Sequence, residues 1–124
     1  MSKEEYKYTE DHEWIDIKLH QPRLGITDFA QRELGDIIFV ELPSPGDKFS
    51  KGDAIGTLEA VKTIADIYVP IDCKILSVNS KLEDNPELIN KDPFGEGWII
   101  EIGIIDLKEC DKFLSLDEYE DFIK

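Results

Sequence analysis

The sequence is poor in the residues on which most catalytic and metal sites depend. It contains two histidines, one methionine and two cysteines in 124 residues. Neither histidine lies in an H-E-x-x-H context, and no G-x-S-x-G, Walker or dinucleotide-binding motif is present. Cys73 and Cys110 lack C-x-x-C spacing, so we expect two buried thiols with no disulfide or metal role. These absences argue against a metalloenzyme, a serine hydrolase and a nucleotide-binding enzyme.

Long apolar runs and basic clusters are also missing. The longest apolar stretch, residues 98–105, is interrupted by Glu101 and is far shorter than the roughly 20 residues of a membrane helix. Fourteen Lys and Arg against 28 Asp and Glu give a formal net charge of −14, which repels phosphate backbones and anionic lipids. The sequence therefore predicts no nucleic-acid partner and no membrane partner.

The first residues bear on location. Residues 1–5 are acidic, and they carry neither the apolar core of a signal peptide nor the Arg-rich composition of a transit peptide. We expect this segment to be disordered. The predicted location is the bacterial cytoplasm, with a mitochondrial location only for a processed eukaryotic chain.

What is present predicts one mainly β domain over residues 1–124. Apolar and polar residues alternate over 14–19 and 100–104, which is typical of half-buried strands. Further β-rich runs, separated by Gly, Pro and Asp turn residues, lie at 37–40, 54–58, 67–69 and 75–78. Short strands at this spacing predict a flattened β-sandwich or barrel.

Helices are expected in two places. Asp28 can cap a short internal helix that ends at Gly35. Residues 106–124 are expected to form a helical C-terminal segment, with capping boxes at Asp106–Glu109 and Ser115–Glu118. The apolar side chains of this segment would pack on the sheet.

One stretch of the chain contains a candidate functional residue. In residues 56–70, two β-rich runs flank Glu59–Thr63, which places Lys62 at or beside the tip of a hairpin. Taken alone, such a lysine is more often a solvated charge that protects a sheet edge. The residues around it favour a functional interpretation.

The sequence around Lys62 resembles the attachment hairpin of the H-protein family of the glycine cleavage system, whose members are lipoyl carriers. The likeness runs in order, without large gaps, over residues 6–124. The matching segments are Tyr8–Trp14, Leu24–Asp28, Ala30–Gln31, Leu34–Asp36, Phe39–Pro43, Val78–Asn79, Leu88–Asn90, Asp92–Gly95 and Gly97–Trp98. The sequence departs from the family at several positions: Ala60 stands where the family usually has Ser, Phe29 where many members have His, and Cys73 where a turn glycine is common, and residues 19–23 replace the usual acidic or glycine-rich turn.

The resemblance implies a lipoyl-domain-like fold, the barrel-sandwich hybrid, and lipoate joined covalently to Lys62. Glu59, Ala60, Val61 and Thr63 would complete the attachment hairpin. The implied protein is a carrier and not an enzyme, and a monomer is expected. It would take the aminomethyl group of glycine from glycine decarboxylase to aminomethyltransferase and be reoxidised by dihydrolipoamide dehydrogenase. A lipoate ligase or lipoyl transferase would modify the lysine.

The resemblance also implies a cleft into which the loaded arm folds back. Glu13, Ile26 and Asp66 hold the matching positions, where a carboxylate can pair with the protonated amine of the cargo. Other roles stay open for these charges. Glu13 is equally explained as a charge at the start of a strand. Glu59 and Asp66 either form a negative frame around Lys62 or only solvate the hairpin.

Two functions use Lys62 and remain to be separated. One is the aminomethyl shuttle; the alternative is a lipoyl relay that passes lipoyl groups to other lipoate-dependent complexes and needs no cleft. A biotin carrier is disfavoured, because biotin hairpins typically flank their lysine with methionine and the one methionine here is Met1. The shuttle is the favoured interpretation.

Overall fold

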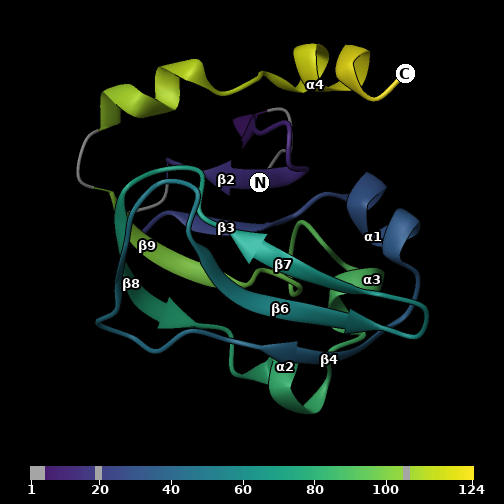
Figure 1. Ribbon diagram of the computed structural model, residues 1–124. Coiled ribbons are helices and arrows are strands. Elements are labelled where there is room, and N and C mark those ends of the chain that lie inside the picture. Colours follow the sequence, from purple (N-terminus) through teal and green to yellow (C-terminus); the bar gives the residue numbers. More distant parts are fainter. Residues whose placement is uncertain (1–4, 19–20, 105–106) are drawn as a thin grey trace.

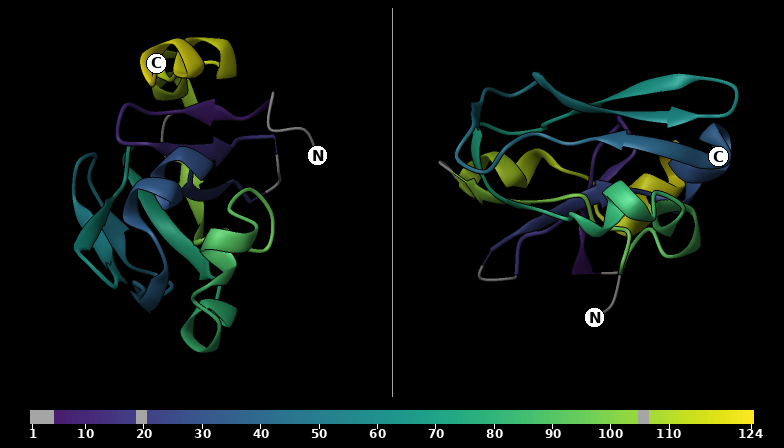
Figure 2. Two further views of the ribbon diagram at one scale, coloured as in Figure 1. Left: turned by 90° about the vertical axis from the view of Figure 1, so that its right-hand side faces the viewer. Right: turned by 90° about the horizontal axis from the view of Figure 1, so that it is seen from below.

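The computed structural model describes residues 5–18, 21–104 and 107–124, which form two antiparallel β-sheets with short helices around them (Figure 1). The larger sheet has six strands in the order β1-β2-β3-β9-β8-β5, and the smaller has three in the order β4-β6-β7. Figure 2 shows the two sheets as separate layers. The predicted mainly β fold is confirmed, as a flattened sandwich and not as a closed barrel.

The elements are short. The larger sheet contains β1 (Lys7–Tyr8), β2 (Glu13–Asp16), β3 (Arg23–Ile26), β5 (Lys48–Phe49), β8 (Cys73–Val78) and β9 (Ile100–Ile104). The smaller sheet contains β4 (Ile37–Glu41), β6 (Ala54–Ala60) and β7 (Ile64–Tyr68). The helices are α1 (Asp28–Leu34), α2 (Lys81–Asp84), α3 (Leu88–Lys91), the 3-10 helix η2 (Leu107–Lys112) and α4 (Leu116–Phe122).

The main core lies between the two sheets. Successive residues of a strand point to opposite faces, so Val40, Leu58 and Ile67 of the smaller sheet face inward together. They belong to one buried cluster with residues of the larger sheet that include Ile75 and Ile102. Burial of apolar surface, worth roughly 25 cal/mol per Å², stabilises the sandwich and fixes the position of the hairpin.

A second, aromatic cluster joins the C-terminal helix to the larger sheet. In Figure 1 the C-terminal segment crosses beside β1 and β2, and the rings of Tyr8 and Tyr119 stack with centroids 5.0 Å apart. Tyr6 stacks on Trp14 at 4.8 Å, and the Trp14 Nε1 donates to the backbone oxygen of Pro93 at 2.9 Å. The predicted packing of this segment on the sheet is confirmed for Tyr119 and Ile123, whereas Phe122 is 46% exposed.

The observed strands contain or overlap every predicted run, but their edges and burial differ. The strand predicted over 14–19 ends at Asp16, with Leu19 outside the described residues, and it is not half-buried: all four residues of β2 are buried. The main core covers one face of β2 and the aromatic cluster covers the other. β1, β3, β5, α2 and α3 were not predicted, because elements of two to four residues carry too little periodicity to detect.

The predicted helix ends are partly correct. Thr27, and not Asp28, caps α1: its backbone is extended, and its side-chain oxygen accepts from the Ala30 N–H at 3.2 Å. Gly35 ends this helix as predicted, with φ of 82°. The capping box at Ser115–Glu118 is confirmed, since both of its hydrogen bonds are present.

Two expectations fall largely outside the described residues. The capping box predicted at Asp106–Glu109 begins at a residue that is not described, and the segment after it is a 3-10 helix. Of the segment predicted to be disordered, only Glu5 is described, and its carboxylate lies 2.9 Å from the Lys18 Nζ.

Candidate functional site

Lys62 lies at the tip of the hairpin formed by β6 and β7, as the sequence predicted. Glu59 pairs with Ile64, and the Ala60 N–H donates to the Thr63 oxygen at 2.8 Å, which closes a tight turn. The Val61 N–H donates to the Asp36 backbone oxygen at 3.3 Å and joins the tip to the segment before β4. The lysine is therefore carried on a braced backbone.

Asn90 of α3 holds the segment against which the tip rests. Its Oδ1 accepts from the Ile37 N–H, and its Nδ2 donates to the Gly35 oxygen and the Gln31 Oε1, each at 2.9 Å. These groups belong to α1, to its C-cap Gly35 and to the start of β4. One amide side chain thus connects three elements beside the hairpin, and Figure 1 shows α1 and the hairpin tip at the same end of the molecule.

The Lys62 side chain is exposed to solvent, and the structure records no ion pair for it among the described residues. A shallow hollow of about 400 Å³ beside it is lined by Arg32, Glu33, Leu34, Gly35, Asp36, Val61 and Lys62. An accessible amine on a braced turn fits a covalently attached arm, because an enzyme can reach the amine without unfolding the sheet.

The three residues expected to form the docking cleft lie on both sheets. Glu13 and Ile26 are directly opposite each other on β2 and β3, and they are 3% and 6% exposed. Asp66 lies on β7 and is exposed. Tyr68 connects the two positions: its backbone hydrogen-bonds to the Glu13 carboxylate, and its hydroxyl donates to the Asp66 Oδ2 at 3.4 Å.

Burial changes the chemistry of Glu13. Loss of hydration, with a smaller contribution from the nearby Asp11, raises the pKa of this carboxyl to about 8. Hydrogen bonds from the Thr9 hydroxyl, at 3.1 Å, and from the Tyr68 backbone act in the opposite direction. At neutral pH the carboxyl therefore holds its proton, so a plain solvated charge at the start of a strand does not describe this residue.

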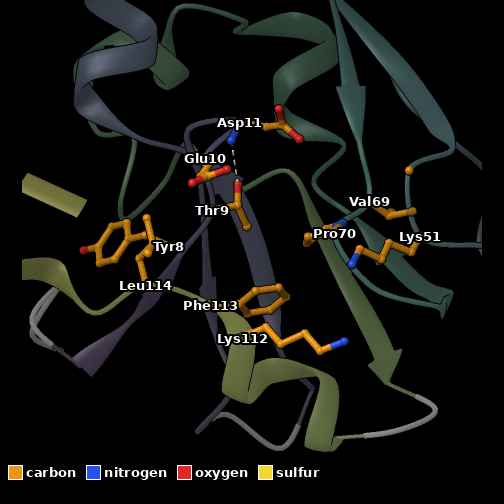
Figure 3. Close-up of a pocket in the computed structure, with 11 residues that line it drawn as sticks. Tyr8, Thr9, Glu10, Asp11, Lys51, Val69, Pro70, Lys112, Phe113 and Leu114 are labelled. Carbon is orange, nitrogen blue, oxygen red and sulfur yellow. Dashed lines mark hydrogen bonds between the residues drawn. The ribbon is translucent and has the colours of Figure 1, made fainter. Parts of the chain in front are cut away.

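A separate hollow of about 360 Å³ lies at the opposite end of the hairpin (Figure 3). Lys51, Val69, Pro70 and Phe113 form part of its wall. Val69 follows Lys62 by seven residues along an extended strand, which is about 23 Å at 3.3 Å per residue. Glu13, Ile26 and Asp66 do not line this hollow, whereas Thr9, whose hydroxyl donates to the Glu13 carboxylate, does.

The sequence reasoning missed a hydrogen-bonded chain beside the expected cleft. The His12 Nδ1 and the Thr27 Oγ1 each lie 2.8 Å from the Tyr119 hydroxyl. His12 has a positive φ of 66°, which is uncommon for a residue other than glycine. These hydrogen bonds connect Tyr119 of α4 to Thr27 at the start of α1. Residues 107 positions apart make the first of these contacts, so no local pattern signals it.

The His, Cys, Asp and Glu side chains in the described part of the chain form no group of three or more that suits a metal ion. None of the helices in that part of the chain is long and apolar enough to cross a membrane.

Comparison with known proteins agrees with this geometry. The family model described as Glycine cleavage H-protein matches residues 6–124. The glycine cleavage system H protein of Listeria innocua is 50% identical over 113 residues, covering 91% of this chain and 90% of that protein. That of Staphylococcus epidermidis is 44% identical over 119 residues, covering 96% and 94%. The crystal structure of a glycine cleavage system H protein from Mycobacterium marinum superposes with a TM-score of 0.87 at 35% identity, covering 95% of each chain.

An exposed lysine on the braced hairpin of a β-sandwich, together with the match to the H-protein family, makes this chain a carrier protein, which holds its cargo on a side chain and is not itself a catalyst. The chain belongs to the glycine cleavage H-protein family. Membership makes it a lipoyl carrier of glycine cleavage and implies contacts with the enzymes of that system.

Proposed function

We propose that Lys62 is the lipoylation site and that the loaded chain carries the aminomethyl group of glycine from glycine decarboxylase to aminomethyltransferase. When bound, the lipoyl group supplies the disulfide that accepts this cargo and that dihydrolipoamide dehydrogenase later restores. The observation that carries the proposal is the exposed Lys62 amine at the tip of a hairpin in a member of this family. The bacterial origin of the relatives supports a cytoplasmic location.

The hairpin residues have separate tasks in this proposal. Ala60 is 4% exposed and anchors the strand in the core, while the Asp36 oxygen holds the Val61 N–H. The lysine side chain is then the first flexible segment of the arm, so motion is confined to the arm and the sheet stays rigid. Glu59 and Asp66 flank the lysine and favour partner surfaces that carry basic side chains.

The test of the attachment site is the intact mass of the protein. After incubation with a lipoate ligase, lipoate and ATP, the wild-type chain should gain the mass of one lipoyl group. Lys62→Arg should gain nothing, whereas the control Lys51→Arg, at an exposed turn lysine, should behave like the wild type. A single lipoyl group on Lys62→Arg would refute the assignment.

The proposal extends to the protection of the cargo. Glu13 and Asp66 would bind the protonated amine of the loaded arm, and Ile26 would exclude water from it. Glu13 and Ile26 are covered in this structure, so docking needs a local movement of the turn between β1 and β2 or of Tyr68. On docking, Glu13 would release the proton it holds at neutral pH and become the counter-ion.

Release of the cargo into water tests this second part. Glu13→Gln should leave lipoylation intact. Once both variants are fully lipoylated and then loaded by the decarboxylase, Glu13→Gln and Asp66→Asn should each speed the release of formaldehyde and ammonia. Loss of one charge-assisted contact of about 1.5–3 kcal/mol would raise the exposed fraction roughly tenfold or more. Glu83→Gln, at an exposed carboxylate on α2, is the control. Equal release rates would leave the two acids without this role and favour the lipoyl relay.

A further inference from the structure

The outer face of the smaller sheet carries an apolar row beside Lys62. Phe39 on β4 lies directly opposite Glu59 on β6, and Glu59 lies directly opposite Ile64 on β7. Directly opposed residues project from the same face of a sheet. Phe39 is 53% exposed and Ile64 is 63% exposed, so this row, which we call the tip row, faces solvent.

A β-bulge enlarges the apolar surface at the tip row. The pairing of β4 with β6 shifts register between Ile37 and Phe39, so Ile38 has no opposing residue and is 51% exposed. At the hairpin tip, Val61 is 69% exposed. Four of the seven large hydrophobic side chains exposed in the described part of the chain therefore lie around Lys62. Scattered exposed hydrophobics need no explanation, but a group beside one functional residue indicates a contact surface.

An acidic row follows on the same face. Glu41, Thr57 and Asp66 are directly opposed across β4, β6 and β7, two residues further from the tip. With Glu59 of the tip row, this face carries three carboxylates and no basic side chain within the two rows. The matching surface of a partner has apolar side chains opposite the tip row and basic side chains opposite the acidic row.

We propose that the tip row and the acidic row are the docking surface for the ligase that attaches the lipoyl group to Lys62. This inference rests on the proposed function of Lys62. The ligase must bring its acyl group to the Nζ of Lys62 itself. Lys62 is three residues after Glu59 and two residues before Ile64 in the sequence. An enzyme that acts on the loaded protein meets the far end of the arm and can do so without covering this face.

The acyl-transfer step also requires the ligase to approach the sheet face beside Lys62. The deprotonated Lys62 amine attacks the carboxyl carbon of lipoyl adenylate, which the ligase makes from lipoate and ATP. A C–N bond forms, the C–O bond to the phosphate breaks, AMP leaves and the amine loses a proton. The amine has to enter the ligase active site, so the sheet face next to the hairpin tip comes against the ligase surface around that opening.

The experiment measures ligation and binding with a purified ATP-dependent lipoate ligase. In Phe39→Thr/Ile64→Thr, residues of high strand propensity replace both apolar ends of the tip row. Loss of two anchoring side chains should lower kcat/KM for lipoylation by at least about tenfold, mainly through KM. Calorimetry without ATP should show a matching loss of affinity for the unmodified chain. Val61→Thr, a nearly isosteric change at a 69% exposed side chain, should act in the same direction without altering the fold.

A matched control separates this surface from exposure in general. Leu76 is a bulge residue of β8, on the larger sheet, and is 38% exposed. Leu76→Thr should leave kcat/KM within about twofold of the wild type, because contacts outside an interface contribute little to affinity. Glu41→Gln/Glu59→Gln should weaken the salt dependence of kcat/KM, since fewer charges then interact across the interface.

The outcomes separate this inference from the function on which it rests. Lipoylation of the wild type but not of Lys62→Arg supports the attachment site in every case. If that holds while Phe39→Thr/Ile64→Thr and Val61→Thr stay within about twofold of the wild type in kcat/KM, the docking surface is refuted. Unchanged ligation with weaker binding of aminomethyltransferase would also refute it, and would assign the face to an enzyme that uses the loaded arm.

Discussion

At the scale of single residues, Glu13 shows how position changes chemistry. Its sequence context, next to Trp14 at the start of a strand, gives no sign that the carboxyl is buried. The second sheet and the turn between β1 and β2 cover it, and the pKa rises to about 8. A carboxyl that holds a proton at neutral pH pairs with a cationic group only after it releases that proton. An exposed carboxylate is already ionised, so its pairing with a cation is not coupled to proton release.

The raised pKa of Glu13 predicts how stability depends on pH. The folded protein binds this proton more tightly than the unfolded chain, whose pKa is near 4.5. The contribution of Glu13 to the free energy of unfolding should therefore fall as pH rises from about 4.5 to about 8, by at most about 1.4 kcal/mol per pH unit. Glu13→Gln removes this dependence, so the variant should gain stability relative to the wild type between pH 5 and pH 8.

Urea unfolding at several pH values in this range measures the difference between the two proteins. Subtraction of the wild-type curve removes the contributions of the other carboxylates. Glu83→Gln, an exposed position on α2, is the control and should show no such trend. A pH-independent difference between Glu13→Gln and the wild type would mean that the Glu13 carboxyl is ionised in the folded protein.

At the scale of elements, the stability of the short helices in this protein depends on the residues that cap their ends. α4 has seven residues, too few for an isolated helix to be stable in water. Its capping box satisfies two backbone N–H groups, and Tyr119 attaches it to the aromatic cluster. The same reasoning explains why the Thr27 cap matters for α1, whose far end supports the hairpin through Asn90.

Ser115→Ala should destabilise the protein by about 0.5–2 kcal/mol, because the Glu118 N–H loses its side-chain partner. Lipoylation should persist, since α4 does not contribute to the described surroundings of Lys62. Ser80→Ala is the matched control: Ser80 occupies the N-cap position of α2 but makes no side-chain capping bond. Urea denaturation midpoints measure both effects, and equal midpoints for the two variants would contradict the capping role of Ser115.

At the scale of the whole molecule, the sandwich protects its two thiols. Cys73 is fully buried in the main core and Cys110 is 2% exposed. Burial, with a smaller contribution from Asp72, raises the pKa of the Cys73 thiol to about 11. The reactive thiolate is therefore scarce at neutral pH, as the sequence-based expectation of buried thiols implied.

Both thiols should react slowly with a disulfide reagent in the native protein and rapidly in denaturant. For Cys73, the change in pKa from 9 to about 11 alone lowers the thiolate fraction by about 100-fold near pH 8. Stopped-flow absorbance with and without urea measures the two rates, and the lipoyl group is omitted by use of Lys62→Arg. Stoichiometric reaction of the native protein at the denatured rate would show that the core opens freely.

The sequence by itself determined the features that depend on neighbouring residues. Alternation and turn residues predicted most strands of the two sheets, Gly35 predicted the end of α1, and the spacing of Ser115 and Glu118 predicted the capping box. The segment around Lys62 predicted a hairpin tip for the same reason, because β6, the turn and β7 are contiguous in the chain.

Only the tertiary structure decided the features that depend on residues far apart in the chain. Asn90 reaches Ile37 across 53 positions to brace the hairpin, and the second sheet buries Glu13 and raises its pKa. The bulge at Ile38 turns an apolar run that resembles a buried strand into the exposed surface beside Lys62. Register, burial and dielectric environment arise when distant segments pack together, so local sequence predicts the attachment hairpin but not the surface and electrostatics around it.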